Sequence, residues 1–327
     1  MKTPAAVATA LLLAVTGVLP AGPPQEKQVS AEARWVAHMD VEAFVTSGFG
    51  KFMLDRMSEK PEAVEGMDEF IETFNMDLTQ DLFSVTLYGT EYAPTAAVVI
   101  LRGRVDHDRL LELLGANEAH ETLEYGDHTI HTWLQAPEGE EDDGVRHGAF
   151  HGDELVVISR TADVLKHALD VLDGEAGSLA GASDSFLPRF SEGAFLTVAG
   201  TDFAVPEDAK PKAAVLLKKV SGMWMELGEA RDAMFLRGGV TAVSARDGQQ
   251  LRDILAGLVA LARLGQENAT EMGKELGPWA PLLKGTRVSG RGASVELEVT
   301  ATLDEVLDMM VQLAEQKEAA AAMENGE

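Results

Sequence analysis

Residues 152–174 join a short apolar run directly to an amphipathic helical pattern, and this unit constrains the fold more than any other stretch. Residues 155–159 predict a buried strand. The helix after it is predicted by apolar residues at helical spacing, namely Val164, Leu165, Ala168, Leu169 and Leu172. Thr161 suits the N-cap of this helix, and Asp173-Gly174 suits its end, because glycine readily adopts the left-handed conformation there.

The succession of strand and helix recurs in three other places: residues 34–39 before Asp40, residues 96–101 before 107–114, and residues 295–299 before the capping box Thr302 to Glu305. We therefore predict an α+β fold of two related units, each a mainly antiparallel sheet with helices packed on one face. The first unit spans residues 33–175 and the second 186–317, with a frayed tail at 318–327. The Gly/Ala/Ser-rich residues 174–185 mark the predicted boundary.

Finer expectations follow from local patterns. Gly48 and Gly50 interrupt the helix that Asp40 begins, so a kink or close packing is expected there, and Pro61 suits the first turn of the next helix. Residues 121–125 and 128–134 predict a hairpin that turns at Gly126-Asp127. In the second unit we expect a helix at 209–227, a hairpin formed by 230–237 and 239–245, and helices at 249–264 and 267–276.

The first 22 residues resemble a secretory signal peptide, with Lys2 ahead of an apolar run too short to span a bilayer comfortably. We expect an extracytoplasmic protein, periplasmic or secreted, without an integral membrane span in the mature chain. Retention of this segment as a membrane anchor is the alternative.

Charge and cysteine content exclude several classes of protein. With 54 acidic and 27 basic residues the net charge is −27, which repels phosphate backbones and anionic membrane surfaces, so nucleic acid is not an expected partner. The absence of cysteine excludes disulfides, thiolate metal sites and cysteine nucleophiles. Apolar residues make up 46% of the 327 residues and charged residues 25%, which is typical of a globular protein with a large core.

Histidines are the first candidate metal ligands, since five of the eight fall between His120 and His151. His128 and His131 are three residues apart on a strand and therefore point to opposite faces. His147 could lie across the sheet from His131, which leaves His131, His147 and His151 as weak candidates. The alternative is that these histidines are solvated or packed across strands, and we expect no cofactor.

Other polar groups have structural explanations. The acidic residues 138–143 lack the ligand spacing of an EF-hand and suit a solvated hairpin tip. Asp77, Asp81, Asp106 and Asp108 stand where a helix or strand begins, so they are expected to cap rather than catalyse. Nucleophile motifs such as G-x-S-x-G and H-E-x-x-H do not occur. Several methionines could line a lipid-accepting groove, with ordinary core packing as the alternative: Met53, Met57, Met67, Met223, Met225, Met309 and Met310.

The run from Asn75 to Gly89, NMDLTQDLFSVTLYG, followed by VILRGRVD from Val99 to Asp106, resembles a pattern in uncharacterised secreted bacterial proteins. In these a signal peptide precedes a first strand with a tryptophan such as Trp35. The resemblance covers mainly residues 33–175. It implies the exported compartment and the α+β fold, and it brings no activity, cofactor or site residue.

These observations favour a non-enzymatic exported protein that acts as a binding or structural module, with an unknown protein or a small apolar ligand as its partner. The alternative is a carrier that holds an apolar ligand between sheet and helices, which requires an internal cavity of about 300 Å³ or more. A metal-dependent hydrolase is the third possibility and requires histidines or carboxylates that converge in a cleft.

Overall fold

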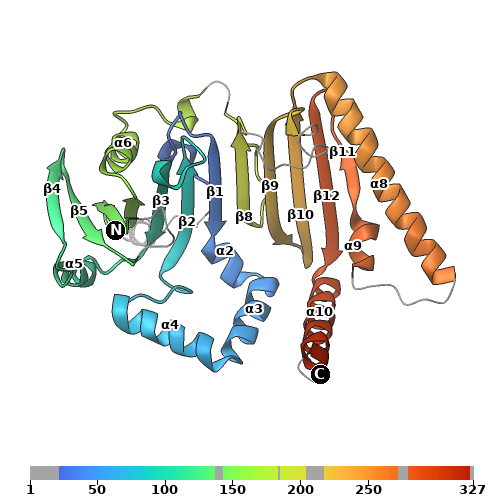
Figure 1. Cartoon of the computed structure of the whole chain (residues 1–327), viewed down its shortest axis with the longest axis horizontal. Coiled ribbons are helices and arrows are strands. Elements are labelled where there is room, and N and C mark those ends of the chain that lie inside the picture. Colours follow the sequence, from blue (N-terminus) through green and yellow to red (C-terminus); the bar gives the residue numbers. More distant parts are fainter. Residues whose placement is uncertain (1–21, 137–142, 183–184, 204–216, 272–278, 325–327) are drawn as a thin grey trace, which may run out of the picture.

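The computed structural model describes residues 22–136, 143–182, 185–203, 217–271 and 279–324. Their strands form one twelve-stranded antiparallel sheet in the order β11-β12-β10-β9-β8-β1-β2-β3-β7-β6-β5-β4 (Figure 1). The strands are β1 (Trp35–Asp40), β2 (Leu82–Gly89), β3 (Ala97–Gly103), β4 (Glu121–Tyr125), β5 (His128–Leu134), β6 (Val145–His151), β7 (Leu155–Ser159), β8 (Ala194–Thr201), β9 (Val220–Ala230), β10 (Ala233–Ala242), β11 (Arg287–Ser289) and β12 (Ser294–Thr302).

The α+β class and the antiparallel sheet are confirmed, but the strands of both predicted units belong to one continuous sheet. The first strands of the two units, β1 and β8, pair with each other near the middle of the sheet, where Val36 stands opposite Ala199. Outward from this seam the order is β1-β2-β3-β7-β6-β5-β4 on one side and β8-β9-β10-β12-β11 on the other. On each side the first three strands in sequence lie next to one another, and the strand that comes last in sequence, β7 or β12, pairs with the third of them. The duplication itself stays a prediction.

In the first half, helices cover both faces of the sheet, which corrects the expectation of helices on one face for that unit. The α-helices are α2 (Val41–Thr46), α3 (Gly48–Ser58), α4 (Pro61–Phe74), α5 (His107–Gly115), α6 (Ala162–Asp173), α8 (Ala245–Glu271), α9 (Ala280–Gly285) and α10 (Leu303–Glu324); short 3₁₀ turns are η1 (Glu26–Gln28), η2 (Pro94–Ala96) and η3 (Leu179–Gly181). α6 packs against Ile100 and Val157, whereas α5 faces their strand neighbours Leu101 and Ile158. Because β3 and β7 are apolar on both faces, both faces need cover. In the second half, the described helices α8 and α10 pack on one face, as predicted.

Three apolar clusters hold these layers together. On the sheet-facing side of α6, Leu165 and Leu169 are fully buried against the strands of the first half. In the second half, α2, α3 and α10 pack around Phe195 and Met234, and α8 packs around Val295. The helix α6 ends as predicted, because Gly174 adopts φ 79° and its backbone N–H bonds to the last turn. Thr161 stands at its N-cap position, although its side chain makes no capping bond.

The predicted domain boundary at residues 174–185 packs into the first core where the structure describes it. Leu179 is buried, and its backbone N–H donates to the carbonyl of Val29 at 2.9 Å. Ser178 also forms an isolated bridge with Ser30. A buried apolar side chain fixes this stretch despite its small neighbours, so small residues alone do not make a linker here.

Within the predicted helix at 209–227, residue 217 is helical and residues 218–219 form a turn, but the prediction is wrong from Val220 onward, because residues 220–230 form the strand β9. Met223 and Met225 lie on one face of the strand and Trp224 on the other. Over so few residues, apolar side chains can satisfy both the two-residue period of a strand and the spacing of a helix. Gly222 weakens a helix further. The remaining predicted residues, 209–216, lie outside the described residues.

The predicted hairpin turn at Gly238 is also displaced. β9 and β10 turn at Arg231-Asp232, both with positive φ, as a two-residue primed turn requires. Gly239 instead lies inside β10, where a Cβ would collide with the indole ring of Trp224. Glycine in this strand marks the close approach of an indole ring rather than a turn.

Other local predictions are confirmed. Asp40 Oδ1 accepts the N–H of Ala43 at 2.8 Å and begins α2, and Thr302 and Glu305 form the capping box of α10. The expected interruption at Gly48 is a break between α2 and α3, where the N–H groups of Gly48 and Phe49 donate to the carboxylate of Glu229 at 3.1 and 2.8 Å. This contact joins the two halves of the chain.

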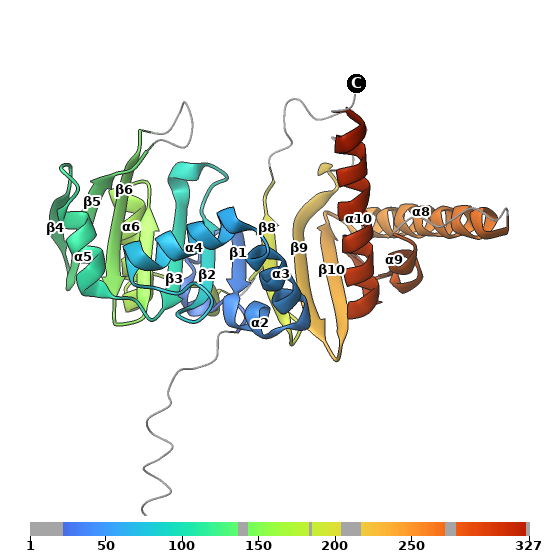
Figure 2. The ribbon, with the colours of Figure 1, turned by 90° about the horizontal axis from the view of Figure 1, so that it is seen from below.

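α8 unites the two predicted helices at 249–264 and 267–276 over their described residues and extends away from the sheet in Figure 2. Ile254, Leu258 and Leu261, one side of this helix, are exposed. α10 continues to Glu324, so the tail predicted to fray is helical over its described part, as its alanines and glutamates favour. In the ranges that the structure describes, we find no helix with the length and apolar content needed to cross a membrane.

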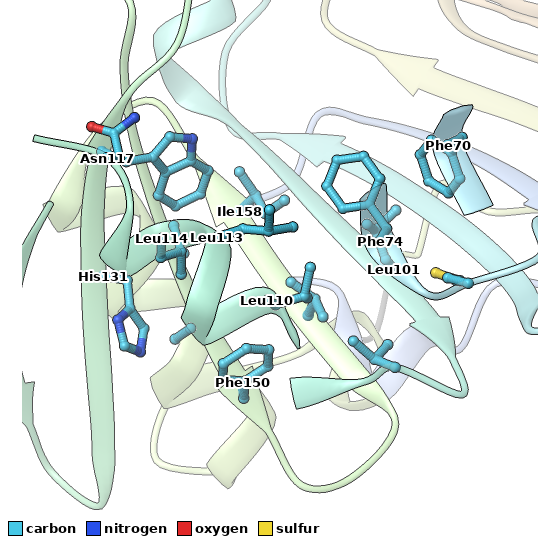
Figure 3. Close-up of a pocket in the computed structure, with 16 residues that line it drawn as sticks. Phe70, Phe74, Leu101, Leu110, Leu113, Leu114, Asn117, His131, Phe150 and Ile158 are labelled. Atoms are coloured by element: carbon cyan, nitrogen blue, oxygen red, sulfur yellow. The ribbon is translucent and has the colours of Figure 1, made fainter. Parts of the chain in front are cut away.

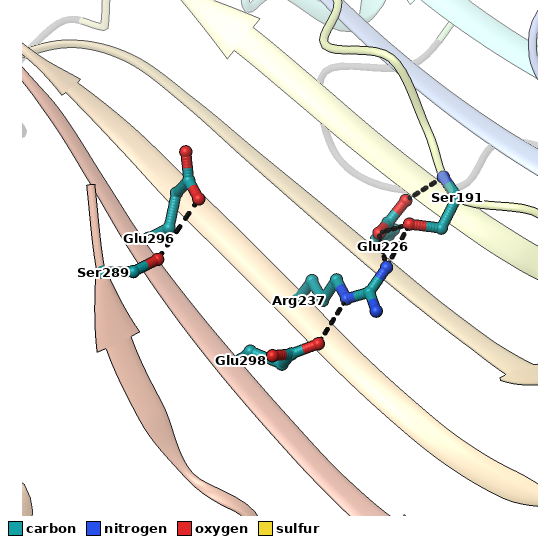
Figure 4. A network of polar contacts seen from close by, with 6 residues as sticks. All are labelled: Ser191, Glu226, Arg237, Ser289, Glu296 and Glu298. Atoms are coloured by element: carbon teal, nitrogen blue, oxygen red, sulfur yellow. Dashed lines mark hydrogen bonds and ion pairs between the residues drawn. The ribbon is translucent and has the colours of Figure 1, made fainter. Parts of the chain in front are cut away.

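A polar network crosses the face of β9, β10 and β12 that lies opposite α8 and α10 (Figure 4). The Glu226 side chain is only 2% exposed, and its carboxylate accepts the N–H and hydroxyl of Ser191 at 2.7 and 2.5 Å. Arg237 Nη1 lies 3.5 Å from Glu226, and its Nε donates to Glu298 at 2.8 Å. The buried carboxylate is thus compensated, and the network ties the segment before β8 to three strands.

Candidate functional site

An apolar cavity of about 390 Å³ lies between the sheet and the helices α4 and α5 (Figure 3). Strands β3, β5, β6 and β7 form its floor and the two helices its roof. In Figure 3, Phe70 and Phe74 lie at one end and Asn117 and His131 at the other. The lining residues are Phe70, Phe74, Met76, Leu101, Val105, Leu110, Leu113, Leu114, Asn117, His131, Trp133, Gly148, Ala149, Phe150, Val156 and Ile158.

The roof is held in place at its polar edge. α4 ends at Asn75, which adopts φ 52° and donates its side-chain amide to Asp106 Oδ2 at 2.6 Å. Asp106 in turn caps α5 by accepting the N–H of Arg109 at 3.0 Å, and Arg109 Nε donates to the carbonyl of Thr73 at 2.8 Å. These bonds fix the two helices to each other, so the roof does not depend on side chains filling the space beneath it.

The floor has its shape because of one glycine. Gly148 lies on β6 opposite His131 of β5, and a Cβ at this position would approach the ring of Trp133 to 3.0 Å. The missing side chain lets the indole ring lie close to the sheet, and thereby leaves the space above it open.

Polar groups occur at few places around the cavity. His120 Nε2 and His131 Nδ1 lie 3.0 Å apart in a shared hydrogen bond, and the Asn117 amide donates to the carbonyl of Leu134 at 2.9 Å. Burial lowers the pKa of His131 below its usual value, and the neighbouring His120 lowers it further. His131 is therefore neutral at physiological pH.

His107 is a further polar group beside the cavity. Its ring stacks on Phe150 with centroids 4.2 Å apart, and its Nε2 is buried without a hydrogen-bond partner among the described residues. An unpaired buried nitrogen is costly unless a ligand or water meets it. His107 Nε2 is thus an unsatisfied polar atom behind Phe150, which lines the cavity, and His107 itself is not a lining residue.

A second group of side chains lies on the opposite face of the sheet, at the end of α6. Asp173 accepts hydrogen bonds from His128 Nε2 at 2.8 Å and from His151 Nε2 at 3.0 Å, and the two rings stack with centroids 5.4 Å apart. Burial alone would raise the pKa of Asp173, but the hydrogen bonds from the two histidines outweigh it and leave the pKa below its usual value. Together these residues form the histidine–aspartate cluster.

The three weak metal candidates do not converge. His131 lines the cavity, whereas His147 lies on the other face, where its Nδ1 is 2.9 Å from Thr132 Oγ1. His151 belongs to the histidine–aspartate cluster together with His128, a residue that the sequence did not mark as its partner. The parity argument that separates His128 from His131 is right, but the sheet pairs His131 with Gly148 rather than with His147.

The remaining candidates have structural roles or lie outside the described residues. Asp77 accepts the N–H of Thr79 at 2.8 Å and Asp81 accepts the N–H of Asp77 at 2.9 Å, so the expected turn and cap roles are confirmed. Residues 138–142 of the acidic tip are not described. The seven candidate methionines lie elsewhere than the cavity: Met309 and Met310 pack near Phe195, and the methionine that does line the cavity is Met76.

Comparisons with known proteins assign no family. No protein-family model matches the chain, and no curated protein is significantly similar to it. Among solved structures, crystal form III of TP0453 is similar with a TM-score of 0.46 and 8% identity, covering 89% of this chain and 98% of that chain. Crystal form I of TP0453 gives a TM-score of 0.42 and 8% identity, with 90% and 98% covered. The resemblance to secreted bacterial proteins stays a prediction.

Proposed function

We propose that this protein is a non-enzymatic binding protein that holds a small apolar molecule in the cavity between α4, α5 and the sheet. The observation that carries the proposal is the cavity itself. Its volume of about 390 Å³ falls in the range of small-molecule sites, about 300–1,000 Å³, and its walls are aromatic and aliphatic with a few polar groups. This is the property that the carrier alternative requires.

The ligand is a neutral molecule with at most one or two uncharged polar groups. The lining contains neither lysine nor arginine to hold a carboxylate or phosphate, and His131 is neutral. The net charge of −27 also disfavours anions. A hydroxyl, ester or amide group would meet His131 or Asn117 at one side, while the hydrocarbon part contacts Phe74 and the leucines of α5.

An energetic argument supports occupation of the cavity. The cavity is partly open and its walls are apolar, so an apolar ligand that covers them removes this surface from water, a gain of about 25 cal/mol per Å². The bonds from Asn75 and Arg109 hold the roof in place, so the site stays open to a ligand.

Export is part of the proposal and is supported by Lys2 and the apolar run that follows it. Two alternatives remain for comparison. An interaction module would use an exposed apolar surface, such as Ile254, Leu258 and Leu261 on α8. A metal-dependent hydrolase would need ligands within a cleft that holds substrate, and the cavity residues are almost entirely apolar.

The test is titration of the purified protein with N-phenyl-1-naphthylamine, a neutral apolar fluorophore, alongside Leu113→Trp. Leu113 lines the cavity, and an indole at this position occupies the space that the ligand needs. We expect saturable probe binding in the wild type and at least about tenfold weaker binding in the variant, with an unchanged or higher Tm because the void is filled.

Leu111→Trp is the matched control, since Leu111 lies on the same helix but is exposed. It should bind the probe like the wild type. Equal probe affinity in Leu113→Trp and the wild type would show that the probe binds elsewhere and would refute the cavity as the site. Native mass spectrometry of the protein from its exported fraction then gives the mass of the natural ligand.

A further inference from the structure

We propose that His128, His151 and Asp173 bind a divalent first-row transition metal, with Zn²⁺ the best match, on the face of the sheet opposite the cavity. Imidazole nitrogens with one carboxylate oxygen are a ligand set that zinc readily accepts. This site is separate from the cavity and does not depend on the proposed function.

The sheet register brings the two histidines together. β5 and β6 pair with His131 opposite Gly148, and the same register continued three residues along both strands sets His128 opposite His151. Directly opposed residues on one face have Cβ atoms about 4.5–5.5 Å apart, which is within reach of a shared ion. Asp173 approaches from α6, the helix that packs on this face.

The distances suit an ion after rotation of the side chains. One ligand atom from each residue can be chosen so that all three lie within 4.8 Å of one another. At zinc–ligand distances of about 2.0–2.2 Å, tetrahedral coordination sets the ligand atoms about 3.3 Å apart. His128 and His151 now bond to different oxygens of Asp173, at 2.8 and 3.0 Å, and the three ligand atoms lie within 4.8 Å of one another. Binding therefore requires one carboxylate oxygen to face both histidines and side-chain shifts of up to about 1.5 Å, which rotation of these partly exposed side chains can supply.

The end of α6 supplies an independent reason to expect a cation. Helix C-termini carry a partial negative charge and favour lysine, arginine or another cation. The last turn of α6 contains Asp170 and Asp173 and no basic residue. Two carboxylates at the negative end of a helix are unfavourable, because like charges repel. A bound divalent cation would be attracted both to the carboxylates and to the helix end.

Asp170 is positioned to support the site. Tyr125 donates its hydroxyl to both oxygens of Asp170, at 2.9 and 3.0 Å, and Tyr125 stands opposite His128 in the hairpin of β4 and β5. This bond links the start of β5 to the last turn of α6 and so holds His128 close to Asp173.

The site is open enough to exchange its ion and small enough to need a fourth ligand from solvent. The side chains of His128, His151 and Asp173 are 12%, 25% and 37% exposed. Three protein ligands leave one tetrahedral position for water or a small anion. The ion therefore enters from solvent without any movement of the sheet.

The experiment is isothermal titration of the protein with ZnCl₂ after expression without a polyhistidine tag and removal of bound metal by a chelator. We expect one equivalent of Zn²⁺ to bind. His128→Gln and Asp173→Asn should each weaken binding by at least about 100-fold, since even loss of an outer partner costs about 10–100-fold. Co²⁺ should give the visible absorption of a low-symmetry site in the wild type and not in the variants.

His147→Gln is the matched control, because His147 lies on β6 and on the same face but outside the cluster. It should bind Zn²⁺ like the wild type. Near-ultraviolet circular dichroism checks that each variant is folded, and Asp173→Asn, which preserves shape, serves if His128→Gln does not fold. Absence of saturable Zn²⁺ binding in the wild type, or equal weakening in His147→Gln and His128→Gln, would overturn the proposal.

Discussion

His38 provides a sharp test of how burial at the centre of the sheet affects stability. It lies on β1, is 4% exposed, and its Nδ1 is 2.8 Å from Thr86 Oγ1. In the full chain, which retains Gly22 and is the protein to be assayed, its Nε2 is 2.8 Å from the Gly22 carbonyl. Burial lowers the pKa of His38 from 6.5 to about 4, although the bond to Gly22 opposes this shift. The imidazole is therefore neutral in the folded protein at neutral pH.

The direction of the pH dependence follows from proton uptake. In the unfolded chain His38 titrates near its ordinary pKa of about 6.5, so between pH 6.5 and 4 the unfolded state binds a proton that the folded state does not. The stability is complete above pH 6.5 and is lost as the pH falls toward 4. A pKa difference of about 2.5 corresponds to about 3 kcal/mol in the free energy of unfolding.

The assay is urea denaturation of the wild type and His38→Gln at several pH values between 7.5 and 4.5. Glutamine retains hydrogen-bonding groups and does not titrate in this range. All other groups contribute nearly equally to both proteins, so the difference between their free energies of unfolding isolates His38. We expect the wild type to lose about 2.5 kcal/mol relative to the variant between pH 7.5 and 4.5. A difference that stays constant within about 0.5 kcal/mol would refute the assignment.

Two further predictions test packing. Leu169→Ala should lower the free energy of unfolding by about 2–5 kcal/mol in chemical denaturation, because Leu169 lies on the sheet-facing side of α6 and is fully buried. An unchanged denaturation midpoint would contradict this placement. Gly66→Ala should raise the free energy of unfolding by about 0.5–1 kcal/mol, since a Cβ at this exposed position of α4 meets no atom within 4 Å; a destabilised variant would show that the helix needs glycine there.

Elements whose signals are local are predicted well from the sequence. Gly174 ends α6 because a left-handed residue closes the helix, and Asp106 begins α5 because its carboxylate reaches the N–H of Arg109. These interactions involve residues within a few positions of one another. Interactions between residues close in the sequence therefore determine where these helices begin and end, and the rest of the fold only has to accommodate them.

Tertiary contacts override local signals at β9 and β10. Val220, Trp224 and Leu227 satisfy a helical spacing, but the strand places Trp224 over Gly239 of β10, and this pair decides the structure. Nothing in residues 209–227 alone reveals that a glycine in another strand will accept the indole ring. A glycine pair such as 238–239 more often indicates a turn, so the local signal favours the wrong interpretation there.

The cavity and the histidine–aspartate cluster are hidden from the sequence for the same reason. The cavity is lined by residues from Phe70 to Ile158, and its empty space is a property of how several elements and a glycine fit together. The cluster depends on the register of β5 against β6, whose joining loop includes the acidic tip and gives no two-residue turn to fix the pairing. In the register that the sheet adopts, His147 stands opposite Thr132. A shift by one residue would instead set His147 opposite His131, which is the pairing that the sequence suggests.

Strand alternation also separates the two proposed sites. His128 and Ile130 of β5 face α6, whereas His131 and Trp133 of the same strand line the cavity. Because the sheet lies between them, an ion at the cluster and a ligand in the cavity share no contacting atom. Leu113→Trp should therefore leave Zn²⁺ binding intact, and His128→Gln should leave probe binding intact. A variant that weakened both would indicate damage to the strands themselves, so each set of variants is the control for the other.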